Sequence, residues 1–282
     1  MKGNRFSYSL AVALAAVLPK PASRLLAKSI AAVYSSASKD LAIVKDNLRE
    51  ALGHLPDKEL TSQARQVIQN FSFFLVDLFY SRELSNGFIE NKVRVRGLHF
   101  LDEALAQNKG AIVASAHVGH WELAGMTLAR LGYPLHAVAL KHRDAWVDAL
   151  FHEWRSRHQL DILPFGAYLR RCYEVLKNNE VLGLNGDRLF SGSGVPVSFF
   201  GKEVFFPRGP ARIGAAMDAP VLPCFFFMDK DRYLLEIRRP LSAGDERQMT
   251  QEFAGILEKA IRERPTQWLI FQRFWEKQSW PE

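Results

Sequence analysis

Cysteine is scarce in this chain of 282 residues, which contains only two. Cys172 and Cys224 lie far apart and form no CxxC pair, so zinc-finger and dithiol redox motifs are excluded. Cys172 falls in a helical pattern and Cys224 in an apolar strand pattern. We therefore expect two buried, reduced thiols, which suits a protein that faces the cytosol.

A long apolar run is also missing. The longest one, residues 6–18, follows basic residues and precedes two prolines. About 13 helical residues measure about 20 Å, which is less than the ~30 Å hydrocarbon core of a bilayer. A cleaved signal peptide, an interfacial or re-entrant anchor and a buried helix all fit this run. We favour the anchor, because the rest of the chain has a cytosolic character.

Several motifs of other enzyme classes are absent. The sequence has no P-loop and no GxGxxG, which argues against a nucleotide-binding enzyme. It has no GxSxG, the nucleophile elbow that a serine hydrolase or thioesterase of the α/β class requires. No dense basic run and no aromatic RNA-binding signature occur, so we expect no nucleic acid partner.

The composition is that of a globular protein with a net positive charge. Hydrophobic residues make up 48% of the chain and charged residues 24%, enough for a sizeable core. The formal net charge is +7. Such a balance favours anionic partners, above all membrane surfaces and phosphorylated lipids, although a basic surface without a specific partner also fits.

Periodicity divides the chain into a helical N-terminal region and an α/β core. Residues 23–37, 39–52 and 58–80 follow the helical period, and we place the boundary near residue 85. Beyond it, short apolar or alternating runs alternate with helical segments, which predicts a mostly parallel mixed sheet flanked by helices. We expect residues 1–85 to be a helical, membrane-associated region and residues 86–282 the α/β core, together one structural unit. The predicted strands cover residues 92–96, 110–115, 134–140, 162–163, 181–184, 220–228 and 233–238.

The most informative segment follows the second predicted strand. His117 lies where a buried strand ends and a helix begins, the edge at which open α/β sheets bind ligands. Five helical steps would place Glu122 about 140° away from His117. The two side chains can therefore meet only if His117 precedes the helix and Glu122 lies in its first turn.

This pair predicts general-base chemistry. A neutral imidazole can take a proton from a hydroxyl group near pH 7, and a carboxylate on its second nitrogen fixes the tautomer. Two alternatives remain open: His117 and Glu122 cap a helix, or His117, His120 and Glu122 bind a metal ion. We do not favour metal, because no further pair with ligand spacing follows.

The segment HVGHWE at residues 117–122 resembles the HxxxxD/E motif of the glycerolipid acyltransferase superfamily. More closely, it is similar to the bacterial lipid A late acyltransferase branch, the lauroyl and myristoyl acyltransferases. The resemblance covers roughly residues 6–276 in the expected order. Arg208 stands where relatives in the superfamily carry an acid, and the chain departs from the lipid A enzymes in being somewhat short and in having a weak N-terminal anchor. The other matching segments are residues 44–48 (VKDNL), 185–188 (NGDR), 199–211 (FFGKEVFFPRGPA), 219–223 (APVLP) and 265–268 (PTQW).

The resemblance implies roles for these residues. His117 would be the base, Glu122 its partner, and Asp187 a third catalytic residue. An arginine in the helix after the second buried strand would contribute to substrate binding, and both Arg155 and Arg157 qualify. We expect Arg208 and Arg212 to contact phosphate, because guanidinium groups bind phosphate in bidentate fashion. Arg188 is a further substrate-binding candidate.

The resemblance also implies the reaction. An acyl thioester of acyl carrier protein or coenzyme A would donate a fatty acyl group to a lipid hydroxyl, with no cofactor. The expected acceptor is a lipid A precursor; another glycolipid, an aminolipid or a lysophospholipid is the alternative. The expected location is the cytoplasmic face of the inner membrane, bound peripherally or monotopically. A non-catalytic protein of lipid surfaces would share the basic charge but would not need His117 with Glu122.

Overall fold

The computed structural model describes residues 5–53, 55–164, 169–189 and 194–276. Its centre is a seven-stranded sheet with the order β1-β9-β8-β2-β5-β3-β4. All neighbouring strands are parallel except β8 and β9, so the predicted α/β class with a mostly parallel mixed sheet is confirmed. The strands are β1 (Val93–Arg96), β2 (Ala111–Ser115), β3 (Leu135–Ala139), β4 (Asp161–Pro164), β5 (Val181–Asn185), β8 (Val221–Asp229) and β9 (Arg232–Ile237).

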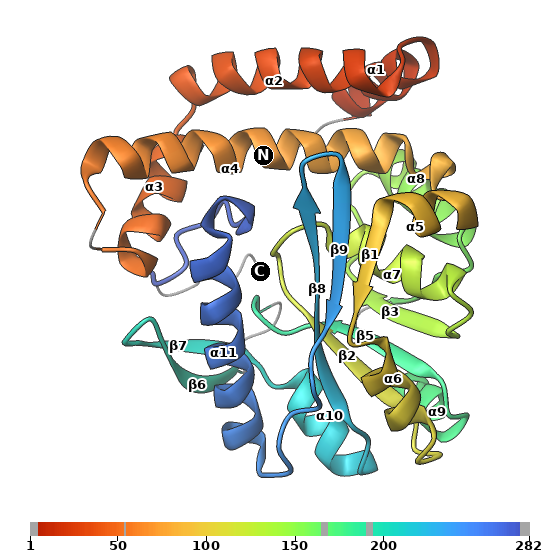
Figure 1. Cartoon of the computed structure of the whole chain (residues 1–282). Helices are drawn as coiled ribbons and strands as arrows, with labels where there is room; N and C mark the ends of the chain where they lie inside the picture. The colour runs from red at the N-terminus through yellow and green to blue at the C-terminus, as the bar shows by residue number, and fades with distance from the viewer. Residues whose placement is uncertain (1–4, 54, 165–168, 190–193, 277–282) are drawn as a thin grey trace.

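Helices cover the sheet, and one of them lies across the carboxyl end of a central strand. Figure 1 shows α4 lying across the carboxyl end of β8, with α2 stacked on the far side of α4. The N-terminal helices are α1 (Arg5–Val17), α2 (Lys20–Ala37), α3 (Asp40–Ala51) and α4 (Asp57–Phe79). The remaining helices are α5 (Asn86–Lys92), α6 (Leu98–Leu105), α7 (Trp121–Arg130), α8 (Ala145–Ser156), α9 (Leu169–Lys177), α10 (Gly209–Met217) and α11 (Glu246–Glu263), with short 3-10 turns η1 (Ser81–Glu83) and η2 (Pro265–Gln267).

Local sequence explains where these helices begin. Pro56 precedes α4, and Asp57 and Glu59 place negative charge in its first turn, where the helix dipole favours it. α11 starts with a capping box in which Asp245 and Gln248 satisfy each other's backbone N–H groups. β8 is buried over seven consecutive residues, as expected for a central strand covered on both faces.

The helix α2 is fixed to the rest of the molecule by polar contacts. Arg24 donates to both oxygens of the buried Asp77 on α4, at 2.8 and 2.9 Å, and the Tyr233 hydroxyl of β9 donates to the same carboxylate. Small and polar residues of α2, such as Ser23 and Ala31, face α4. Its large apolar residues are therefore left on the outer face.

Two features differ from the sequence prediction. Residues 194–207 form a separate antiparallel hairpin of β6 (Gly194–Phe199) and β7 (Lys202–Pro207). The sequence pattern predicts neither a helix nor a strand for residues 191–206. Of these, residues 191–193 lie outside the described part of the chain. The buried side chains of the hairpin alternate, but the preceding Gly- and Ser-rich stretch obscures the period. The strand β3 is mostly half-buried rather than buried, because its residues line a cavity.

Both cysteines are free and buried, as predicted. Burial raises the pKa of Cys172 to about 11 and that of Cys224 to about 12, so neither thiol is a nucleophile near neutral pH. Among the helices in the described part of the chain, none combines the length and apolarity that crossing a bilayer requires.

Candidate active site

His117 lies in the loop between β2 and α7, at the carboxyl edge of the sheet. Its Nδ1 is 2.9 Å from Asp187 Oδ1, and its backbone N–H donates to Asp187 Oδ2 at 2.8 Å. Asp187 is completely buried and follows β5, the parallel neighbour of β2. The two residues meet because strand ends in a parallel sheet reach the same edge, as Ser115 and Asn185 do in direct register.

This contact fixes the state of the imidazole. Nδ1–H donates a hydrogen bond to the carboxylate, which leaves the lone pair on Nε2. The His117 side chain is 13% exposed and lines a cavity, whereas its acidic partner is fully enclosed. A carboxylate bound to a histidine ring in this way can hold one tautomer and can stabilise the imidazolium form.

The loop that carries His117 is held by elements distant in sequence. The backbone N–H of Leu269 donates to the His117 carbonyl, and Gly119 N–H donates to the Gln267 carbonyl, both at 2.8 Å. Gly119 has φ of +67°, and a Cβ there would lie 2.1 Å from the Phe226 carbonyl oxygen. Only glycine fits this position, because both the backbone angle and the space exclude a side chain.

His120 ties the same loop to α4. Its Nε2 donates to the Phe74 carbonyl at 3.0 Å, and its Nδ1 accepts from Leu123 N–H at 3.3 Å, which caps α7. Burial lowers the pKa of His120 to about 4, so the ring is neutral near pH 7. His120 therefore connects the loop to α4 and caps α7.

The predicted pairing of His117 with Glu122 is wrong in this structure. Glu122 lies in the first turn of α7, as predicted, but its carboxylate accepts from Arg155 Nε at 2.9 Å and Nη2 at 2.6 Å. Burial acts to raise the pKa of Glu122, yet the Arg155 guanidinium outweighs it and holds that pKa below the ordinary value. A bidentate partner on the next helix therefore binds Glu122, and Asp187 binds His117.

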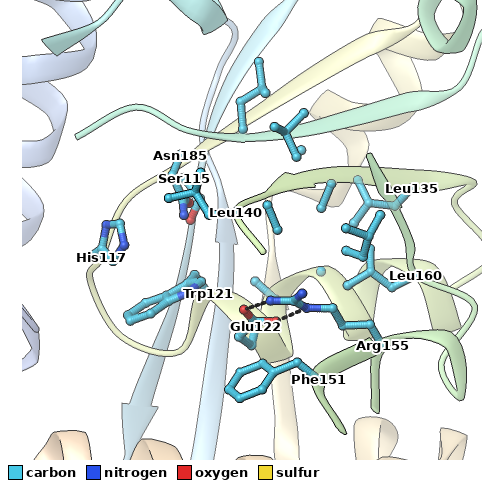
Figure 2. Close-up of a pocket in the computed structure, with 18 of the residues that line it drawn as sticks. Ser115, His117, Trp121, Glu122, Leu135, Leu140, Phe151, Arg155, Leu160 and Asn185 are labelled. Carbon is cyan, nitrogen blue, oxygen red and sulfur yellow. Dashed lines mark hydrogen bonds and ion pairs between the residues drawn. The ribbon is translucent and has the colours of Figure 1, made fainter. Parts of the chain in front are cut away.

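A cavity of about 470 Å³ extends from His117 into the molecule. Figure 2 shows His117 and Trp121 at one end, Leu135 and Leu160 at the other, and the Glu122–Arg155 pair between them. Most of its lining is apolar. Other apolar lining residues are Tyr8 of α1, Phe71, Phe74 and Leu75 of α4, Leu128 of α7, Phe151 of α8 and Ile162 of β4.

The predicted arginines occupy different places. Arg155 is buried and lines the cavity, whereas Arg157 is exposed and pairs with Glu153. A role of either arginine in substrate binding stays a prediction. Arg188 lines the cavity directly after Asp187. Arg208 pairs with Glu246 of α11 at 3.1 Å, and neither it nor the exposed Arg212 is among the described lining residues. Their phosphate contacts stay predictions.

Two basic residues and one aromatic residue line the cavity although the sequence analysis does not predict them as site residues. Lys141 and Arg143 follow β3 and line the cavity. The rule that placed His117 at a strand end applies equally to them, because β3 ends at the same edge. Tyr8 is packed edge-on to Phe79 and Phe151, and no local pattern in an apolar N-terminal helix indicates that contact.

Of the three residues considered as metal ligands, His120 and Glu122 have their side-chain nitrogens and oxygens bound to protein groups. Both nitrogens of His120 contact backbone groups, and both oxygens of Glu122 bind Arg155. Within the described residues, no group of three His, Cys, Asp or Glu side chains could hold a metal ion.

Comparison with known proteins places this geometry in a family context. The model of the bacterial lipid A biosynthesis acyltransferase family matches residues 4–277. Two phosphatidylinositol mannoside acyltransferases from strains of Mycobacterium tuberculosis are 30% identical over 187 residues, 64% of this chain and 59% of theirs. A protein of the same name from Mycolicibacterium smegmatis is 26% identical over 238 residues, 82% of this chain and 78% of its own. The match thus spans less than two thirds of the Mycobacterium tuberculosis relatives.

Proposed function

Since the chain belongs to the bacterial lipid A biosynthesis acyltransferase family, we propose that it transfers a fatty acyl group from an acyl thioester to a hydroxyl group of a membrane lipid. The observation that carries this proposal is the His117–Asp187 pair at the end of a large, mostly apolar cavity. The cavity suits a fatty acyl chain, and the pair suits activation of a hydroxyl group.

In the proposed reaction, His117 Nε2 takes the proton of the acceptor hydroxyl while its oxygen attacks the thioester carbonyl. The C–O bond forms, the C–S bond breaks, and the leaving thiolate takes the proton from the imidazolium. Asp187 keeps Nδ1 protonated and stabilises the charged ring. Such base catalysis contributes typically ~10²–10⁴-fold. The donor is a co-substrate, acyl carrier protein or coenzyme A thioester, and this scheme needs no metal or cofactor.

We propose a lipid A precursor as the first acceptor to test, because of the family to which the chain belongs. The names of the mycobacterial relatives make a mannosylated phosphoinositide the second. An aminolipid or a lysophospholipid would meet the same chemical requirement, a hydroxyl group on an amphipathic molecule. The net charge of +7 suits an acidic acyl carrier protein and an anionic lipid alike.

The outer faces of α1 and α2 support membrane association. Phe6, Leu25, Ile30 and Val33 are between 59% and 75% exposed. A soluble helix turns such side chains inward, whereas an interfacial helix turns them towards the lipid. Tyr8 of α1 also lines the cavity, so one of these two helices contributes to the proposed site. We therefore place the protein, as a proposal, on the cytoplasmic face of the inner membrane, bound peripherally or monotopically.

Expression of wild type, His117→Ala and His152→Ala in a bacterium tests the function. His152 is an exposed histidine on α8, so its replacement is a matched control. Mass spectrometry of lipid extracts should show a species heavier by one acyl group with wild type and His152→Ala only. Purified protein that consumes neither acyl carrier protein nor coenzyme A thioesters with these lipids would contradict the proposal. Persistent lipid binding without turnover would favour a non-catalytic lipid-surface protein.

A further inference from the structure

Three cationic side chains line the mostly apolar cavity without belonging to the Glu122–Arg155 pair. Lys141 and Arg143 follow β3, and Arg188 follows β5. All three therefore come from carboxyl ends of strands, the edge that also carries His117. Leu140, which directly precedes Lys141 and is labelled in Figure 2, lines the same cavity as Ser115 and Asn185.

Lys141 and Arg143 differ from Arg155 in how their charge is balanced. Arg155 is buried and its charge is neutralised by Glu122 at 2.6 Å. Lys141 and Arg143 are exposed, and neither forms an ion pair within the part of the chain that the structure describes. Exposed cations that meet no protein carboxylate are available to an anionic ligand.

The loop that carries them is fixed in place. The backbone N–H of His142 donates to Asp148 Oδ1 at 2.8 Å, and Asp144 accepts from the first N–H groups of α8 at 2.9 and 3.1 Å. Both nearby carboxylates are thus engaged by backbone N–H groups of this segment. Because the backbone of this loop is already held, binding a ligand there loses little backbone conformational entropy.

We propose that Lys141 and Arg143, together with Arg188, bind a phosphate group of a substrate while its acyl chain or acceptor hydroxyl lies in the cavity. The inference rests on the proposed function and adds the chemical class that the cavity entrance recognises. Arg offers a planar fork of donors and Lys a compact point charge, and both bind phosphate. The phosphate belongs either to the pantetheine arm of the donor or to the headgroup of the acceptor.

The experiment compares wild type with Lys141→Ala/Arg143→Ala on substrates with and without phosphate. Donors are an acyl-coenzyme A and the matching acyl-pantetheine, which lacks phosphate; acceptors are a phosphorylated glycolipid and its dephosphorylated form. Arg188 is left unchanged because it adjoins Asp187. Arg157→Ala, an exposed arginine paired with Glu153, is the matched control. Calorimetric titration with coenzyme A and with pantetheine measures binding without turnover.

If the bound phosphate belongs to the donor, the double variant should raise KM for acyl-coenzyme A about 10–100-fold more than KM for acyl-pantetheine. The titration should likewise show a larger loss of affinity for coenzyme A than for pantetheine. If the phosphate belongs to the acceptor, KM should rise more for the phosphorylated glycolipid than for its dephosphorylated form. An equal change on all substrates, or no change, overturns the inference. These results are separate from failure of the proposed function, in which wild type turns over none of the substrates.

Discussion

Two carboxylates of the candidate site, Asp187 and Glu122, bind different partners. Asp187 contacts His117 through both oxygens, one on the ring nitrogen and one on the backbone N–H. Glu122 contacts Arg155 through both oxygens and joins α7 to α8 along the cavity. The first carboxylate therefore orients a histidine that lines the cavity, and the second joins two helices that surround the cavity.

Nearness in sequence is a poor guide to which side chains bind one another in this site. Glu122 lies five residues from His117, and Asp187 lies seventy residues away. Parallel pairing of β2 with β5 brings the distant residue to the same edge, while the turn of α7 carries the near one towards α8. His117 and His120 are also close in sequence but differ in environment: His117 lines the cavity, whereas His120 is fully buried.

The largest expected effect is that of Asp187→Asn on turnover. The amide cannot hold the Nδ1-protonated tautomer, so we expect kcat to fall by ~10²–10⁴-fold with a folded protein. The measurement is steady-state kinetics with circular dichroism as a check of folding. Asp161→Asn is a matched control, because Asp161 contacts His136 Nδ1 at the same 2.9 Å but neither residue is among those that line the cavity. Equal losses in both variants would refute the assignment.

Glu122→Ala should act on stability first. It leaves the buried Arg155 without a partner, and such a break costs about 3–5 kcal/mol of the free energy of unfolding. Glu153→Ala, which breaks the exposed pair with Arg157, should cost under about 1 kcal/mol. Urea denaturation measures both. A folded Glu122→Ala protein of wild-type stability whose kcat is lost would assign Glu122 to the chemistry after all.

His120 should make stability depend on pH. Because its folded pKa is lowered to about 4, the folded state holds it neutral while the unfolded chain takes up a proton below about pH 6.5. Its contribution is thus fully present above pH ~6.5 and declines by ~1.4 kcal/mol per pH unit as the pH falls towards 4. His120→Asn, which keeps a capping side chain, should lack this decline in urea titrations. Parallel pH curves for both proteins would contradict the neutral, buried ring.

Gly183→Ala should shift the preferred acyl chain to a shorter one. The added Cβ would lie 3.5 Å from Ala137 Cβ and 3.6 Å from Leu135 Cδ1, in ordinary contact, so the fold should tolerate it while the cavity loses volume. We expect kcat/KM for the longest accepted chain to fall about 10-fold or more. Gly255→Ala on α11, where a Cβ meets nothing within 4 Å, is the control. Unchanged chain preference would place the acyl chain elsewhere.

Much of the fold could be predicted from sequence because its strands are short apolar runs between glycines, prolines and helical periods. The position of His117 at a strand end followed from the same pattern. The partner of His117 did not, since strand order within a sheet depends on packing between distant segments. The different burial of Arg155 and Arg157 likewise could not be predicted, because residues two positions apart at a helix end face different sides of the helix.

The most direct test of the account is kcat/KM across a double-mutant cycle of His117→Ala and Asp187→Asn. If Asp187 works through the imidazole, the double variant should be no slower than His117→Ala alone, because the ring on which the carboxylate acts is already gone. The same cycle with Glu122→Gln should give losses that multiply. Multiplying losses for Asp187, with non-additive losses for Glu122, would contradict the assignment and restore the pairing that nearness in sequence suggests.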